Sequence, residues 1–172
     1  MTPFMVLVTQ STMSLILSVL IARWYLAPRL SDKSCDQAAL PLLWIHVFRY
    51  APLTLLAPGQ ADPRIPPGVI GVVAYGDLVA ALFALAAIIA IKMKLRTAIG
   101  LVWVFSIVSS ADLVYATARA ASAELYSFYI GWGWYIVNFY VPLLFVTQVQ
   151  IIYYLLKSPA AATLERSAAA KR

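Results

Sequence analysis

The stretch GVIGVVAYGDLVAALFALAAIIAI, residues 68–91, decides the fold class. It carries a single formally charged side chain, Asp77, in an apolar run long enough to cross a bilayer core, which takes about 20 helical residues. Other runs of similar length and composition occur before and after it. We therefore expect an all-α, integral membrane bundle of five transmembrane helices. Their expected bounds are residues 4–25, 38–56, 68–91, 98–121 and 134–156.

The overall composition also indicates a membrane protein. Of the 172 residues, 63% are hydrophobic and 12% are charged, whereas soluble domains are about 25% charged. The single cysteine, Cys35, excludes an internal disulfide. No basic segment precedes the first apolar run, so we interpret it as a retained span and not as a signal peptide. The expected organisation is a five-helix transmembrane domain, residues 1–157, and a short cytoplasmic tail, residues 158–172.

Lysine and arginine are distributed unevenly between the two sides of this bundle. Cytoplasmic connections of membrane proteins retain these residues. The first and third connections and the tail hold ten of the thirteen: Arg23, Arg29, Lys33, Lys92, Lys94, Arg96, Lys157, Arg166, Lys171 and Arg172. The other two connections hold only Arg64 and Arg119. This bias predicts an outside N-terminus and a cytoplasmic C-terminus in a bacterial inner membrane, and it explains the net charge of +6 without a nucleic-acid partner.

Three ionisable residues from different expected spans, Arg49, Asp77 and Asp112, fall at a similar depth near the bilayer midplane. An unpaired ion there costs between about 3 and more than 10 kcal/mol. We therefore expect all three to face the bundle interior, with the planar guanidinium of Arg49 bonding both carboxylates. One positive charge then faces two negative charges. A proton, a charged His46 or a bound cation would supply the difference.

The neighbours of these residues favour close packing and a distorted backbone. Ala74, Ala81 and Ala84 share a helical face with Asp77. This stripe of small residues permits close helix contact and is also a candidate surface for self-association. Pro52 and Pro142 each remove a backbone hydrogen bond inside a span. We expect the resulting distortions to open a cavity toward the outer face, because broken helices in membranes often line cavities.

Other polar residues are candidates for a supporting role or a separate one. Those that could surround the charged layer are Gln10, Tyr115, Arg119 and Asn138. His46 is either a proton acceptor or a hydrogen-bond donor to a carbonyl group. No spaced set of metal ligands occurs. A second axial histidine for haem and an intramembrane lysine for retinal are both missing from the sequence, so no cofactor is expected.

Several segments resemble a family of small, uncharacterised bacterial multi-pass membrane proteins. They are LPLLWIHVFRYAPL, LAPG, AYGDLVAAL, LVWVFSIVSSADL and VPLLFVTQV, and they extend over nearly the whole chain. The most specific residues are the pair His46 and Arg49, the pair Gly76 and Asp77, and Asp112. The chain departs from the family pattern at its serines 106, 109 and 110, which puts a side-chain bonding role there in doubt. The resemblance implies an integral membrane fold and no assigned activity.

The leading hypothesis is a protein that binds or moves a small ligand, a proton or a cation at His46, Arg49, Asp77 and Asp112. Its partners would be the lipid bilayer and that ligand, with a homo-oligomer or a membrane complex possible. A first alternative is a non-catalytic structural or scaffold subunit whose charges only fix the order of the helices. A second alternative is an intramembrane enzyme that uses an aspartate or His46 as general acid or base.

Overall fold

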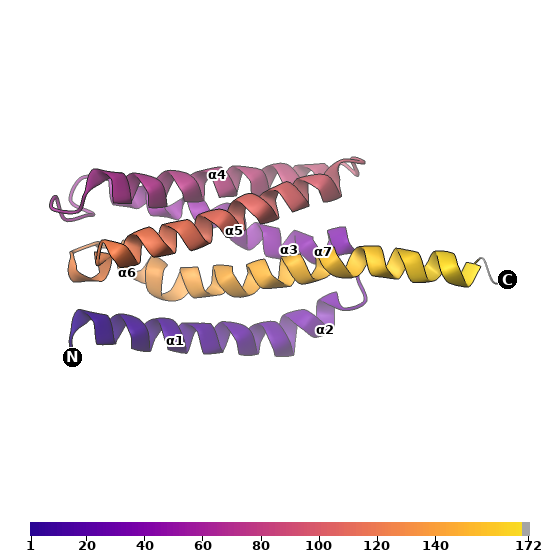
Figure 1. The fold of residues 1–172 in the computed structure, drawn as a ribbon, viewed down its shortest axis with the longest axis horizontal. Coiled ribbons are helices and arrows are strands. Elements are labelled where there is room, and N and C mark those ends of the chain that lie inside the picture. The colour runs from indigo at the N-terminus through magenta and orange to yellow at the C-terminus, as the bar shows by residue number, and fades with distance from the viewer. Residues whose placement is uncertain (170–172) are drawn as a thin grey trace.

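The computed structural model describes residues 1–169, and it describes the side chains of residues 1–157. The described residues form helices and no strands. Figure 1 shows the elements running roughly parallel to one long axis, joined by short connections at the two ends. In chain order they are α1 (Pro3–Ile21), η1 (Ala22–Leu26), α2 (Ala27–Leu30), α3 (Cys35–Val47), η2 (Phe48–Leu56), α4 (Pro67–Lys92), α5 (Ala98–Ser122), η3 (Leu125–Ser127), α6 (Gly133–Tyr135), η4 (Ile136–Tyr140) and α7 (Val141–Ala169).

These elements combine into five continuous helices that are long and apolar enough to cross a membrane. They are Pro3–Leu30, Cys35–Leu56, Pro67–Lys92, Ala98–Ser122 and Gly133–Lys157. The five expected spans are thus confirmed, and every expected span lies within an observed one. The largest difference is at the end of the first span, which continues to Leu30. Within the expected tail, α7 continues as helix to Ala169, and residues 170–172 lie outside the described residues.

Prolines explain where the helices change type. Pro28 and Pro142 each lack the N–H that would bond the carbonyl four residues earlier. In both cases a five-residue π-helix, η1 or η4, ends two residues before the proline. In the second span the α-helix ends at Val47, and the tighter 3₁₀-helix η2 runs through Pro52 to Leu56. The expected distortions at Pro52 and Pro142 therefore take the form of changes in helical type.

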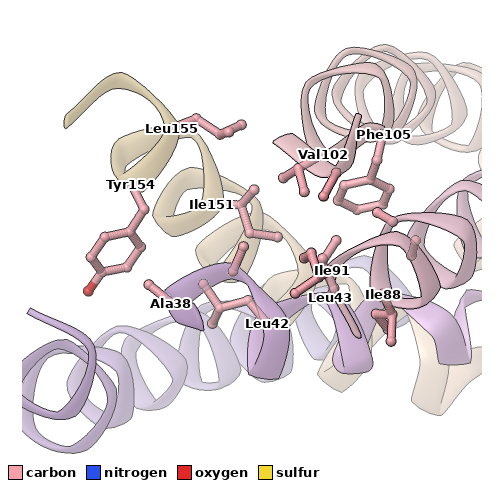
Figure 2. Packing of buried hydrophobic residues seen from close by; sticks show 14 of the residues in the cluster. Ala38, Leu42, Leu43, Ile88, Ile91, Val102, Phe105, Ile151, Tyr154 and Leu155 are labelled. Atoms are coloured by element: carbon pink, nitrogen blue, oxygen red, sulfur yellow. The ribbon is translucent and has the colours of Figure 1, made fainter. Parts of the chain in front are cut away.

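The bundle core lies between α3, α4, α5 and α7. Figure 2 shows Leu42 and Leu43 of α3, Ile88 and Ile91 of α4, Val102 and Phe105 of α5, and Ile151 and Leu155 of α7 gathered in this core. The stripe of small residues on α4 is used here: its alanines 74, 81 and 84 are buried, and α4 packs against α3, α5 and η2. The stripe is thus covered by packing within one chain.

α1 lies at the periphery of the bundle, beside α7 and η4 (Figure 1). Most of its side chains are exposed, and only Ser14 and Ser18 are buried. Thr2 caps this helix by accepting a hydrogen bond from the backbone N–H of Met5 at 3.3 Å, and Pro3 occupies the first turn, where no N–H is needed. One wall of the bundle at this side is therefore a single, loosely packed helix.

Two connections meet at the end of the bundle where the chain begins, called the N-terminal end below. They are residues 57–66 and 123–132, joined by a hydrogen bond of 2.8 Å from the N–H of Asp62 to the carbonyl of Tyr129. Hydrogen bonds from Arg64 lower the pKa of Asp62 to about 2.

A second, smaller apolar cluster of Leu55, Ile65, Val69, Leu125 and Ile130 packs beneath these connections. The charged layer lies between this cluster and the main core.

Candidate functional site

Arg49 is the centre of a buried polar network. Its side chain extends from η2 and is fully buried. Nε donates to Oδ1 of Asp77 at 2.6 Å, Nη1 donates to Oγ of Ser109 at 2.5 Å, and Nη2 donates to Oδ2 of Asp112. The guanidinium thus connects the second, third and fourth spans. The structure brings together the three charges that the sequence placed at one depth.

The two carboxylates reach Arg49 because small residues let their helices approach closely. Asp77 is buried on the alanine face of α4, with 7% of its surface exposed. The residue before it is Gly76, and a Cβ atom built there would overlap the carboxylate of Asp112. Only glycine therefore allows α5 to bring Asp112 this close to α4. This contact gives a physical reason for the Gly76 and Asp77 pair that the family resemblance singled out.

The network continues into the fifth span through residues that the sequence analysis did not select. Ser109 donates to Oε1 of Gln148 at 2.8 Å. The amide nitrogen of Gln148 donates to the backbone carbonyl of Ser106 at 3.2 Å and to its hydroxyl at 3.1 Å. Ser106 and Ser109 are positions at which the chain departs from the family pattern, and in this structure their side chains do form hydrogen bonds. A buried amide in the middle of an apolar span is the signal that could have identified Gln148.

His46 belongs to a different set of contacts. It is fully buried, and its Nε2 lies 3.0 Å from the hydroxyl of Thr147. That hydroxyl donates to the carbonyl of Leu143 at 2.9 Å, so its oxygen accepts from His46. Nδ1 has no hydrogen-bond partner among the described residues. A charged ring would carry a second N–H with no acceptor, so this geometry fits a neutral imidazole that does not contribute a charge to the Arg49 network.

The four residues expected to surround the charges lie elsewhere. Gln10 and Asn138 join α1 to the fifth span: the indole of Trp134 donates to Gln10 at 2.9 Å, and Ser11 donates to Asn138 at 3.1 Å. Neither has a hydrogen bond to Arg49 in the part of the chain that is described. Tyr115 and Arg119 are exposed on α5, Tyr115 by 55%. These two side chains lie on the outer surface of α5, away from the guanidinium.

A cavity of about 200 Å³ lies on the N-terminal side of the charged layer. Arg49 and Asp77 form one part of its wall, and Tyr126 and Trp134, nearer the N-terminal end, form another. The remaining lining is almost entirely apolar: Phe4, Leu7, Pro52, Leu55, Val73, Leu113, Ala116, Thr117, Ala120, Ala121, Leu125, Ile130, Gly133, Ile136, Val137 and Val141. The cavity therefore combines a long apolar surface with one charged region.

The described residues contain no group of three His, Cys, Asp or Glu side chains that could hold a metal ion. At the cavity wall, Asp77 and Arg49 can form hydrogen bonds and ion pairs. Such a concave, mainly apolar pocket with a few polar groups is typical of sites for small molecules.

Comparison with models of protein families identifies a family for this chain. The family model described as "Domain of unknown function (DUF8737)" matches residues 6–156, which include all five spans and the complete Arg49 network. No curated protein and no solved structure matches the chain.

Proposed function

The chain belongs to the family described as "Domain of unknown function (DUF8737)", and on that premise we propose that it binds a mainly apolar small molecule inside the membrane. The apolar part of the molecule fills the cavity, and its one polar end contacts Asp77 and Arg49. The observation that carries this proposal is the cavity itself, whose only charged lining residues among the described side chains are these two. Ionisable residues within membrane spans are expensive to bury and mark functional sites by default.

The polar end must supply the selectivity of this site. Within a bilayer, lipid tails are as apolar as the cavity wall, so burial of an alkyl chain does not by itself favour the cavity over lipid. A hydrogen bond to a buried charged group is worth about 1.5 to 3 kcal/mol. Asp77 and Arg49 can therefore distinguish a molecule with one polar end from the surrounding hydrocarbon.

The proposed setting is the cytoplasmic membrane of a bacterium, with the N-terminus outside and the cavity on the outer side. The uneven distribution of lysine and arginine supports this orientation. Single cysteines introduced at Ala57 and Thr97, both exposed and at opposite ends of the bundle, test it in a Cys35→Ser background. We expect a membrane-impermeant maleimide added to intact cells to label the Ala57 position and not the Thr97 position. The reverse pattern would overturn the orientation.

Photolabelling tests the binding proposal. The probe is a ten-carbon alcohol with a diazirine at the end of its chain, added to the protein in lipid nanodiscs. We expect saturable labelling near Tyr126 and Trp134, because the alcohol group lies at Asp77 and the alkyl end lies toward the N-terminal end. Ala116→Phe fills part of the cavity and should abolish this labelling. Ala118→Phe adds the same side chain on the exposed face of α5 and should leave it unchanged. Equal labelling of both variants would refute the proposal.

A structural role is the second candidate, because Arg49 has hydrogen-bond partners on two other spans. In that case the charges fix the helix arrangement and no ligand is needed. The variant Arg49→Met/Asp77→Asn/Asp112→Asn removes all three charges with little change of shape. Unchanged, saturable labelling of this folded variant would favour the structural role. Loss of labelling from a folded variant would favour binding.

A further inference from the structure

We infer that the polar end of the ligand is a cation, specifically the protonated amine of a long-chain amphiphile. This inference rests on the proposed function and specifies the ligand class. It depends on three observations: the excess of carboxylates over cations in the buried layer, the two carboxylates that already flank Arg49, and the unused oxygen of Asp77.

The buried layer has one negative charge too many. Arg49 is its only cation, and Asp77 and Asp112 both contact it. His46 bonds Thr147 through one nitrogen and has no acceptor at the other among the described residues, so it does not supply the missing charge. Among other cations near this end, Arg119 is exposed and Arg64 is paired with Asp62. When no cation is bound, a proton on one carboxylate must balance this excess. An ammonium group at the layer would replace that proton and give two cations for two carboxylates.

Most donors of Arg49 are directed to groups of the protein. Each of its three guanidinium nitrogens has a partner: Asp77, Ser109 and Asp112. These bonds use three of the five N–H groups of the guanidinium, and a ligand carboxylate at the remaining two would lie beside two carboxylates of like charge. Like charges in a desolvated site repel strongly because the effective dielectric constant is low. The geometry therefore disfavours an anionic ligand, even though an arginine lines the cavity.

Asp77 has the acceptor that a cation requires. Its Oδ1 accepts from Arg49, and its Oδ2 has no hydrogen-bond partner in the described part of the chain. The residue is more than nine-tenths buried, and it forms part of the cavity wall. The free oxygen of Asp112, in contrast, lies against Gly76, and Asp112 does not line the cavity. Asp77 is thus the carboxylate available to a ligand, and an ammonium group bonded to it forms a charge-assisted hydrogen bond.

Competition among three molecules with the same alkyl chain tests this inference. Decylamine, decanol and decanoate compete with the diazirine alcohol at pH 7 in nanodiscs of a neutral lipid, and each concentration is expressed as mole fraction in the bilayer. We expect decylamine to compete at a mole fraction at least ten times lower than decanol, and decanoate to be the weakest. Asp77→Asn should remove the advantage of the amine over decanol.

The possible results separate the inference from the proposed function. Equal competition by all three molecules, or the best competition by decanoate, would overturn the choice of a cation while leaving the cavity as a binding site. Failure of all three to compete would overturn both. If Asp77→Asn does not fold, the order of the three molecules on the unaltered protein still decides the question.

Discussion

Replacing Arg49 with methionine should destabilise the bundle by about 3 to 5 kcal/mol at pH 7, the usual cost of removing one partner from a buried ion pair. Methionine keeps the length and apolar stem of the side chain but removes its charge and its donors. Asp77, Asp112 and Ser109 then each lose a hydrogen bond. The variant therefore isolates the contribution of the guanidinium from that of packing.

The cost of protonating a buried carboxylate gives a similar value for the destabilisation by Arg49→Met. Without Arg49, one more buried carboxylate must take up a proton to avoid an uncompensated charge. Protonating a carboxylate with an ordinary pKa near 3.9 at pH 7 costs about 4 kcal/mol, at about 1.4 kcal/mol for each pH unit. The folded variant then binds a proton that the unfolded chain releases above pH 4, so its stability falls as pH rises. We expect the cost to shrink by about 2.7 kcal/mol between pH 7 and pH 5.

Unfolding in mixed micelles, followed by far-ultraviolet circular dichroism at pH 7 and pH 5, measures both effects. The charge-free variant Arg49→Met/Asp77→Asn/Asp112→Asn is the control, and it should recover most of the lost stability because removal of a whole buried ion network is often close to neutral. A cost below about 1 kcal/mol for Arg49→Met, or a charge-free variant less stable than the single one, would refute this reasoning.

Three smaller changes test other contacts of the structure. Gly76→Ala should cost about 1 to 3 kcal/mol in the same unfolding assay, because the added methyl group overlaps the Asp112 carboxylate and must displace it from its position beside Arg49. Thr147→Val leaves the buried Nε2–H of His46 without an acceptor and should cost about 1 to 3 kcal/mol. The carboxyl carbon of Asp62 should titrate by NMR near pH 2, below the ordinary value, and the stability that its ionised form contributes is present above pH 4 and is lost as pH falls through about 2.

Matched controls accompany these changes. Gly100→Ala adds a methyl group on α5 where no atom lies within 4 Å, and it should be neutral or slightly stabilising. Thr54→Val alters an exposed threonine and should change stability by less than about 0.5 kcal/mol. Equal costs at the test and control positions would contradict the contacts described for Gly76 and Thr147. An Asp62 titration near pH 4 would contradict its ion pair with Arg64.

The spans and the meeting of three charges could be predicted from the sequence because each depends on a single strong constraint. A run of about 20 apolar residues has few alternatives to a membrane helix. An unpaired charge within such a run is so costly that charged residues of opposite sign are expected to pair with one another. Arg49, Asp77 and Asp112 follow this rule, and the prediction that Arg49 bonds both carboxylates is met by the structure.

The rest of the network depends on how each helix is rotated about its own axis and on which helices lie next to one another. The pattern of a single sequence determines neither. Gln148 and Thr147 are on α7, and whether they face Arg49, His46 or lipid depends on how α7 packs. Tyr115 follows Asp112 by one helical turn, yet it is exposed on the outer surface of α5. The π-helix before Pro142 shifts the register of the fifth span, and an ideal helical wheel does not anticipate this shift.

The most direct test of the central claim is an experimental structure of the protein in lipid nanodiscs with decylamine present, at a resolution that shows side chains. The account predicts Arg49 between Asp77 and Asp112 in the bundle interior, with elongated density in the cavity that ends at the free oxygen of Asp77. Arg49 or either aspartate facing lipid, or a cavity closed by side chains with density only outside the bundle, would contradict it.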